Sequence, residues 1–325
     1  MVAIDNVLQL RTNSSVTILR NIWGYELMMT KKALLGLTLM SAMLASTAQA
    51  QDHEPQDGVK VGKMSMMRKL GNLGGALDQQ AAQQYVQTMQ EAQQKRALAP
   101  DNHPQVIRLR EIAKKLIPFA LPWNDRAAEW KWEVNLLGSS QINAYCMPGG
   151  KIAFYTGILD TLKLTDDEVA IVMGHEIAHA LREHGAERAG KSMATNLLVK
   201  GAALFAEYKG YNGQAVAGIG GAGANLAMLK FSRDDETEAD IVGLDIAARA
   251  GYDPRAGVTL WQKMGVVNKK APPKWLSTHP AGTDRINEIR QHFPEVMPLY
   301  AKAKGVELAT IAPFKTNVKG IPEVK

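Results

Sequence analysis

The strongest constraint on the fold is a helix that the sequence marks out after residue 164. Thr165 and Glu168 have the S/T-x-x-E spacing of a capping box, in which each side chain satisfies a backbone N–H of the first helical turn. Leu164 and Val169 stand at the two positions of a hydrophobic staple. The sequence therefore predicts a helix that begins after Thr165 and carries the stretch VMGHEIAHALREHG, residues 172–185.

This helix presents two histidines and a glutamate at a spacing that suits a metal ion. His175 and His179 are four residues apart, so they lie one turn apart on the same helix face. Glu176 follows His175 directly, and its side chain can reach a water on an ion held by the two imidazoles. In this H-E-x-x-H arrangement the glutamate acts as general base, while zinc lowers the pKa of water from ~15.7 toward ~7. By itself, the motif is also compatible with ordinary polar residues on an amphipathic helix.

A metal site on this helix needs a third protein ligand. The three-histidine pattern H-E-x-x-H-x-x-G-x-x-H is excluded, because Arg182 and Gly185 stand where it requires Gly and His. His184 is off the ligand spacing, and we interpret it as a structural or surface residue.

A glutamate on a later helix is the alternative ligand. The segment FSRDDETEAD offers Glu236, and Asp240 lies four residues on, on the same helix face. Glu236 can bind the metal while Asp240 accepts the N–H of a ligating histidine and so fixes its tautomer. Glu238 then points elsewhere, about 200° around the helix. The segment is also compatible with an acidic, solvated helix face.

The order of the predicted elements favours an α+β fold, because helices come first, then strands, then helices again. Residues 130–138 alternate like a strand with one buried face. A second strand is predicted over 151–155, with a hairpin at the turn Pro148-Gly149-Gly150. Besides the helix after Thr165, helices are predicted over residues 77–99, 101–122 (with Ile107 on its apolar face), 229–251, 254–268 and 281–291.

The N-terminal segment has the pattern of a secretory signal peptide. Within residues 28–50, two lysines precede an apolar stretch that ends in the A-x-A site Ala48-Gln49-Ala50. We expect cleavage near Ala50 and export to the periplasm. Residues 1–27 are interpreted as a mis-annotated extension upstream of the true start. An uncleaved anchor is disfavoured, because the apolar run is shorter than the ~20 residues of a membrane span.

Residues 210–229 form a second uncharged stretch, rich in Gly and Ala. A membrane span is disfavoured there, because small residues contribute little transfer energy and Asn212, Gln214 and Asn225 interrupt the stretch. A closely packed helix or a mobile lid over a site is the favoured interpretation.

Composition excludes some classes of function. The net charge is +6, aromatic residues make up only 6% of the chain, and no compact Lys/Arg run stands out. We therefore expect no nucleic-acid partner. The single cysteine, Cys146, permits no intrachain disulfide.

Several motifs together resemble metallopeptidase family forty-eight. HEIAH at 175–179, SRDDETEAD at 232–240 and THP at 278–280 occur in the order and rough spacing of that family. NAYCMPGGKIAFYTGIL at 143–159 is similar to the segment before the family's zinc helix. The match covers about residues 100–292 and is nearest to the soluble, periplasmic LoiP- and BepA-like proteases rather than to the membrane-spanning HtpX and CAAX prenyl endopeptidase.

The resemblance implies a mostly helical gluzincin-type domain with a small β-hairpin or sheet beside the zinc helix. It implies one Zn²⁺ per chain on His175, His179 and Glu236, with Glu176 as the base and Asp240 supporting a ligand. It places His279 near the zinc, either as a transition-state stabiliser or as a group that occupies the open position.

The resemblance also implies an edge strand that pairs with an extended peptide substrate. This assigns Asn143, Ala144 and Tyr145 to the substrate side of the site. The domain boundaries that follow are a flexible leader and Gln-rich helix over 51–100, a zinc metalloprotease domain over 101–292, and a C-terminal tail over 293–325.

These observations predict a periplasmic zinc endopeptidase that acts on unfolded or misfolded exported proteins. Association with the outer membrane or with an assembly machinery is a further expectation from the resemblance. Two alternatives remain open: a latent or chaperone-like zinc protein that binds unfolded chains without turnover, and a metal-dependent hydrolase of non-peptide substrates.

Overall fold

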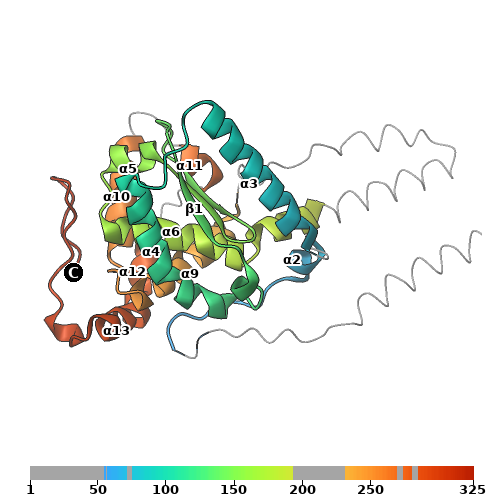
Figure 1. The fold of residues 1–325 in the computed structure, drawn as a ribbon. Helices are drawn as coiled ribbons and strands as arrows, with labels where there is room; N and C mark the ends of the chain where they lie inside the picture. The colour runs from blue at the N-terminus through green and yellow to red at the C-terminus, as the bar shows by residue number, and fades with distance from the viewer. Residues whose placement is uncertain (1–54, 56, 72–74, 193–230, 269–273, 280–284) are drawn as a thin grey trace, which may run out of the picture. The chain divides into compact units, whose positions relative to one another are not determined.

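A three-stranded sheet, order β1-β3-β2, lies beside the histidine-bearing helix (Figure 1). The computed structural model describes residues 55, 57–71, 75–192, 231–268, 274–279 and 285–325, all within the unit Asp52–Lys325. The predicted extension 1–27, the signal peptide 28–50 and the Gly/Ala-rich stretch 210–229 lie outside the described residues. None of the described helices is both long enough and apolar enough to cross a membrane.

The elements have the following bounds. The strands are β1 (Glu133–Leu137), β2 (Ala144–Met147) and β3 (Lys151–Tyr155). The described helices are α2 (Met66–Gly71), α3 (Ala76–Gln94), α4 (Pro104–Ala120), α5 (Thr156–Leu162), α6 (Asp166–Leu181), α9 (Arg233–Arg249), α10 (Ala256–Asn268), α11 (Lys274–Thr278), α12 (Arg285–Gln291) and α13 (Phe293–Lys304). Short 3-10 turns are η2 (Leu121–Trp123), η3 (Ala127–Glu129) and η5 (Leu308–Thr310). This mostly helical α+β architecture confirms the predicted fold class.

The predicted hairpin is formed by β2 and β3, which pair antiparallel with Tyr145 opposite Ala153. Gly149 and Gly150 both adopt positive φ in the connecting turn, a conformation that glycine reaches without strain. The strand predicted over 130–138 is shorter than expected and pairs with β3 in parallel, not as a hairpin neighbour. This arrangement puts β3 in the centre and leaves β2 at one edge of the described sheet.

Helix α6 begins where the capping box predicts. Thr165 Oγ1 accepts the backbone N–H of Glu168 at 3.3 Å, and Glu168 Oε2 accepts the backbone N–H of Thr165 at 2.9 Å. The Glu168 carboxylate is fully buried and also binds Lys263 Nζ at 2.6 Å and Thr316 Oγ1 at 2.8 Å. The start of this helix is therefore fixed both locally and by residues from the C-terminal part of the chain.

Helices α6 and α9 approach each other closely at a pair of glycines. A Cβ atom built on Gly174 would lie 2.8 Å from the carbonyl oxygen of Gly243, and one on Gly243 would lie 2.7 Å from the backbone nitrogen of His175. Both glycines must therefore lack a side chain for the helices to pack at this distance. The contact places the acidic residues of α9 beside the histidines of α6.

Helix α4 packs against α6 and β1, but its buried face differs from the prediction in one position. Ile107 is 51% exposed, whereas Val106 is buried with Leu109 and Ile112. The spacing of the apolar residues in this helix allows either Val106 or Ile107 to lie on the buried face. The packing of α4 against α6 and β1 buries Val106.

The segment predicted as a flexible leader over 51–75 differs from that expectation in its described part. Val59 is fully buried, and its backbone N–H is hydrogen-bonded to Asp245 on α9. Arg68 binds Glu187 at 2.6 Å and Glu238 at 2.8 Å. The burial of Val59 and the partly buried ion pairs of Arg68 hold this segment on the domain, and local composition reveals neither.

The predicted tail over 293–325 likewise packs on the domain. It begins with α13, which contacts α9, and it continues to an isolated bridge between Phe314 and Val324. Thr316, as noted, binds the buried carboxylate of Glu168. The C-terminal residues are therefore part of the fold.

Candidate metal centre

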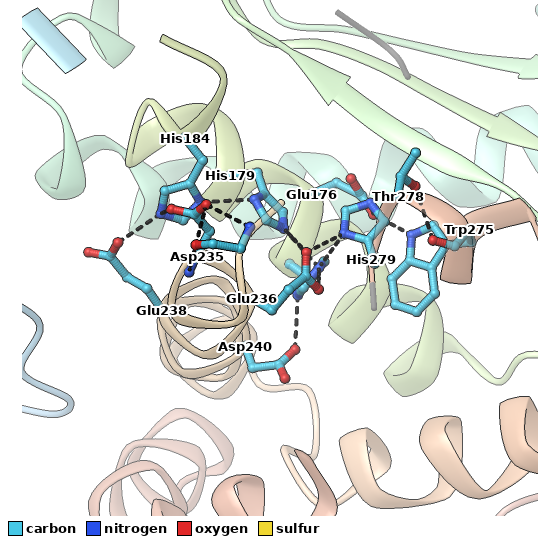
Figure 2. A network of polar contacts seen from close by, with 12 residues as sticks. Glu176, His179, His184, Asp235, Glu236, Glu238, Asp240, Trp275, Thr278 and His279 are labelled. Atoms are coloured by element: carbon cyan, nitrogen blue, oxygen red, sulfur yellow. Dashed lines mark hydrogen bonds and ion pairs between the residues drawn. The ribbon is translucent and has the colours of Figure 1, made fainter. Parts of the chain in front are cut away.

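Three elements bring the candidate residues together (Figure 2). Helix α6 supplies His175, Glu176 and His179. The first two turns of α9 supply Glu236 and Asp240. His279 follows α11 directly. All of these side chains are buried, with 2% to 8% of their surface exposed.

The donor atoms of four residues converge on one point. His175, His179, Glu236 and His279 each offer one atom, and the four atoms lie within 4.8 Å of one another. His175 Nε2 lies 3.1 Å from His179 Nε2 and 3.2 Å from His279 Nδ1. Glu236 Oε1 lies 3.0 Å from His279 Nδ1 and 3.4 Å from His179 Nε2.

These separations fit a zinc ion. Ligands placed tetrahedrally about 2.0–2.1 Å from zinc are roughly 3.3 Å from one another. Nitrogen lone pairs and a carboxylate oxygen that face each other at this distance in a buried space also repel, and a cation between them relieves that repulsion. The donor chemistry, two or three imidazoles and a carboxylate, is that of zinc sites in proteins.

The outer nitrogen of His175 is held by a carboxylate, the arrangement predicted from the spacing of Glu236 and Asp240. His175 Nδ1 lies 2.9 Å from Asp240 Oδ1. Burial raises the pKa of Asp240, but the charge of Arg285 and the hydrogen bond with His175 outweigh it and hold that pKa below its usual value. An ionised Asp240 can only accept, so the His175 proton stays on Nδ1 and Nε2 faces the centre.

The second histidine of the motif, His179, is held in its neutral form by burial. Burial lowers the pKa of His179 well below its usual value, although the hydrogen bond with Glu236 by itself would raise that pKa. A neutral imidazole is the form that binds a metal, so the site favours the ligating state of His179. The ring of Phe231 stacks on this imidazole at a centroid distance of 3.9 Å.

Arg285 is a site residue that the sequence does not reveal. Its buried guanidinium binds both Asp240 and Glu236 and lies 4.0 Å from the ring centroid of Trp261. It therefore orients the two carboxylates that face the histidines. No motif marks it, because α12 reaches the site only through the packing of the C-terminal helices.

Trp275 is a second such residue. Its indole Nε1 donates to Glu176 Oε1 at 2.6 Å, and its ring stacks on His279 at a centroid distance of 4.8 Å. His279 Nε2 lies 3.6 Å from the same Glu176 oxygen. Because Oε1 is engaged by the indole, Oε2 is the Glu176 atom left for a proton.

Strand β2, which the resemblance assigns to the substrate side, contacts helix α6. Tyr155 N donates to Asn143 O at 3.1 Å, so narrow and wide pairs alternate along β2 from that point. The backbone groups of Ala144 and Cys146 then point away from β3, toward the side of β2 that pairs with no other described strand. Asn143, Ala144 and Tyr145 are all at least 90% buried, so the strand offers its backbone rather than these side chains.

His184 is buried, so of the two predicted roles the surface one is wrong. Its Nδ1 lies 2.8 Å from His179 Nδ1, and its Nε2 lies 2.7 Å from Glu238 Oε2. Glu238 points away from the four donor atoms, as the helical rotation predicts, and it binds Arg182 at 2.7 Å.

The chain is similar to several known metalloproteases. Relatives include the mitochondrial metalloendopeptidase OMA1 of Schizosaccharomyces pombe, 31% identical over 61% of this chain and 56% of that protein. The OMA1 of Arabidopsis thaliana is 38% identical over 49% of this chain and 31% of its own length. Metalloprotease LoiP of Escherichia coli is 29% identical over 64% of this chain and 78% of its own length. The chain thus spans less than two thirds of the length of the OMA1 relatives.

Residues 105–292 match Peptidase family M48, and this span is more than half of the chain. The buried His/Glu centre lies within the matched residues. The chain belongs to Peptidase family M48, as the resemblance in the sequence predicts.

Proposed function

We propose that the chain is a zinc-dependent endopeptidase that hydrolyses peptide bonds in unfolded or misfolded exported proteins. The observation that carries the proposal is the convergence of four buried donor atoms directly beside Glu176. His175, His179 and Glu236 would hold the zinc. When bound there, zinc would supply Lewis acidity, which lowers the pKa of water and polarises a carbonyl.

The proton transfers would fall to Glu176. Its Oε1 is occupied by the indole of Trp275, which fixes the carboxylate and leaves Oε2 to accept a proton from the attacking water. The same oxygen would then deliver that proton to the nitrogen of the leaving amine. Burial of Glu176, 2% exposed, keeps bulk water from competing for this step.

The substrate would bind as an added strand. The outward backbone groups of Ala144 and Cys146 on β2 match those of an extended peptide, which only an unfolded or flexible chain can present. This mode of binding recognises the peptide backbone. It therefore supports selection of substrates by their unfolded state and not by one particular sequence. Export to the periplasm rests on the signal-peptide pattern of residues 28–50, while relatives named OMA1 are mitochondrial.

The proposal is tested with the full chain and its Glu176→Gln variant on reduced, denatured casein. We expect cleavage by the wild type, abolition by Glu176→Gln and by a chelator, and no change in Glu129→Gln, the same substitution at an exposed position. Equal cleavage by wild type and Glu176→Gln, unaffected by the chelator, would sink the proposal.

One observation favours a second candidate function. His279 completes a set of four protein donors, and a zinc with four protein ligands has no open position for substrate. A latent zinc protein that holds unfolded chains would have this geometry. It predicts that denatured casein is bound by wild type and Glu176→Gln alike and cleaved by neither. Hydrolysis of small esters without cleavage of casein would instead indicate a non-peptide substrate.

A further inference from the structure

The outer nitrogen of His179 faces a histidine where His175 faces a carboxylate. His179 Nδ1 lies 2.8 Å from His184 Nδ1, and His184 Nε2 lies 2.7 Å from Glu238 Oε2 (Figure 2). His184 is fully buried, so no solvent competes for either of its nitrogens. A metal-binding histidine usually donates its free N–H to a carboxylate or a carbonyl. Here the acceptor is another histidine, His184, which can accept at Nδ1 only if its own proton lies on Nε2.

Only one assignment of protons on the two neutral rings suits a metal. A histidine that binds zinc through Nε2 carries its proton on Nδ1. His179 must therefore donate to His184 Nδ1, which has to be the unprotonated nitrogen. The His184 proton then lies on Nε2 and is donated to Glu238, whose carboxylate only accepts.

Glu238 is fixed at the outer end of this chain of contacts. Arg182 Nε donates to Glu238 Oε1 at 2.7 Å, and Arg68 Nη2 donates to Glu238 Oε2 at 2.8 Å. Arg182 also donates to the carbonyl of Gly62, so the segment before α2 helps to hold the guanidinium that binds Glu238. Two guanidinium groups keep the carboxylate ionised and in place, which makes it a dependable acceptor.

We propose that His184 is a positioning residue that holds the His179 ring in the tautomer with Nε2 directed at the metal, and that Glu238 sets the tautomer of His184. The inference rests on the proposed zinc site. It deepens that proposal, because it gives each histidine of the H-E-x-x-H pair its own support: Asp240 for His175, and His184 with Glu238 for His179.

Two substitutions at position 184 separate positioning from packing. The amide of asparagine ends near the place of histidine Nδ1, so His184→Asn keeps an acceptor for His179. The amide of glutamine ends near the place of Nε2, so His184→Gln keeps the contact with Glu238 but loses that acceptor. We expect His184→Gln to bind zinc about 10- to 100-fold more weakly in a chelator competition with the full chain, and His184→Asn to recover most of this loss.

A second measurement reads the tautomer without metal. In a long-range ¹H–¹⁵N spectrum of the metal-free full chain, His179 should carry its proton on Nδ1 in the wild type and in His184→Asn. The His184→Gln variant should populate the Nε2–H form. Melting temperatures of the metal-free variants report whether either one merely disturbs the fold.

The outcomes are distinct. Zinc affinity of His184→Gln equal to wild type, with an unchanged His179 tautomer, overturns the inference. Equal weakening in both variants, with equally lowered melting temperatures, shows a packing role and also overturns it. A wild type that binds no zinc contradicts the proposed function, and the tautomer spectra then still decide whether His184 positions His179.

Discussion

The close approach of α6 and α9 makes Gly243 a position where one methyl group should disturb both the fold and the metal centre. In Gly243→Ala the new Cβ would lie 2.7 Å from the backbone nitrogen of His175, whereas ordinary contact begins at 3.4 Å. The two helices must therefore separate by roughly 0.7 Å. The atoms in the way are backbone and cannot rotate aside, so the structure has no inexpensive way to accommodate the methyl group.

The expected loss of stability follows from two opposing effects. Overpacking of a core costs typically about 1–3 kcal/mol. Alanine is favoured over glycine inside a helix by ~1 kcal/mol, which leaves a net loss of up to about 2 kcal/mol. For a domain of this size, a loss of about 2 kcal/mol lowers the melting temperature by about 4–8 °C. Metal ligands must hold their places within about 0.5 Å, so zinc binding should also weaken by about tenfold or more.

Gly265→Ala is the matched control. Gly265 lies within α10, and a Cβ there would meet no atom within 4 Å. This variant should gain up to ~1 kcal/mol from helix propensity and leave zinc affinity unchanged. Thermal unfolding and chelator competition measure both quantities. If Gly243→Ala behaves like Gly265→Ala in both, the helices are not in close contact and the reasoning is refuted.

Three further predictions concern charged groups and the fourth donor. Glu168→Ala removes the buried carboxylate that pairs with Lys263 and should cost about 3–5 kcal/mol in urea unfolding; Asp166→Ala, at a pair whose acidic side chain is 65% exposed, should cost about 1 kcal/mol or less. Burial by itself would raise the pKa of Glu187, but the hydrogen bonds from Lys191 and Arg68 lower that pKa from 4.5 to about 2. The ionised carboxylate therefore stabilises the fold above pH 4.5, and this stabilisation is lost as the pH falls toward 2. Glu187→Gln should accordingly be less stable than wild type at pH 7 with a difference that shrinks by pH 3, and a constant difference would contradict this account. His279→Ala should weaken zinc binding yet leave about one zinc per chain at saturating zinc, because the three proposed ligands His175, His179 and Glu236 all remain. An unchanged affinity in chelator competition would exclude His279 as a donor.

Much of the centre could be predicted because its parts lie at local, repeating spacings. The capping box at Thr165 sets the start of α6, and the four-residue spacing puts His175 and His179 on one face. The same spacing pairs Glu236 with Asp240 on α9. Each of these features needs only the geometry of a single helix, which a sequence expresses directly.

Contacts between distant segments could not be predicted in the same way. Arg285 and Trp275 come to the site from short helices near the C-terminus, and nothing in their local spacing points to the carboxylates they bind. The parallel pairing of β1 with β3 leaves no turn signal, because the two strands are not joined by a tight turn. Arg68 belongs to a polar segment whose composition resembles a linker, and its ion pairs with the partly buried Glu187 and Glu238 show that it packs on the domain.

The zinc content of the purified full chain measures whether the four buried donor atoms form a metal site. We expect about one zinc per chain in the wild type and the same content in Glu176→Gln, because Glu176 acts as the base and does not bind the metal. At the same free zinc concentration His175→Ala should hold little or none, because His175 is one of the three proposed ligands. A His175→Ala variant that retains as much zinc as the wild type, or a wild type that holds none, would contradict the proposed metal site.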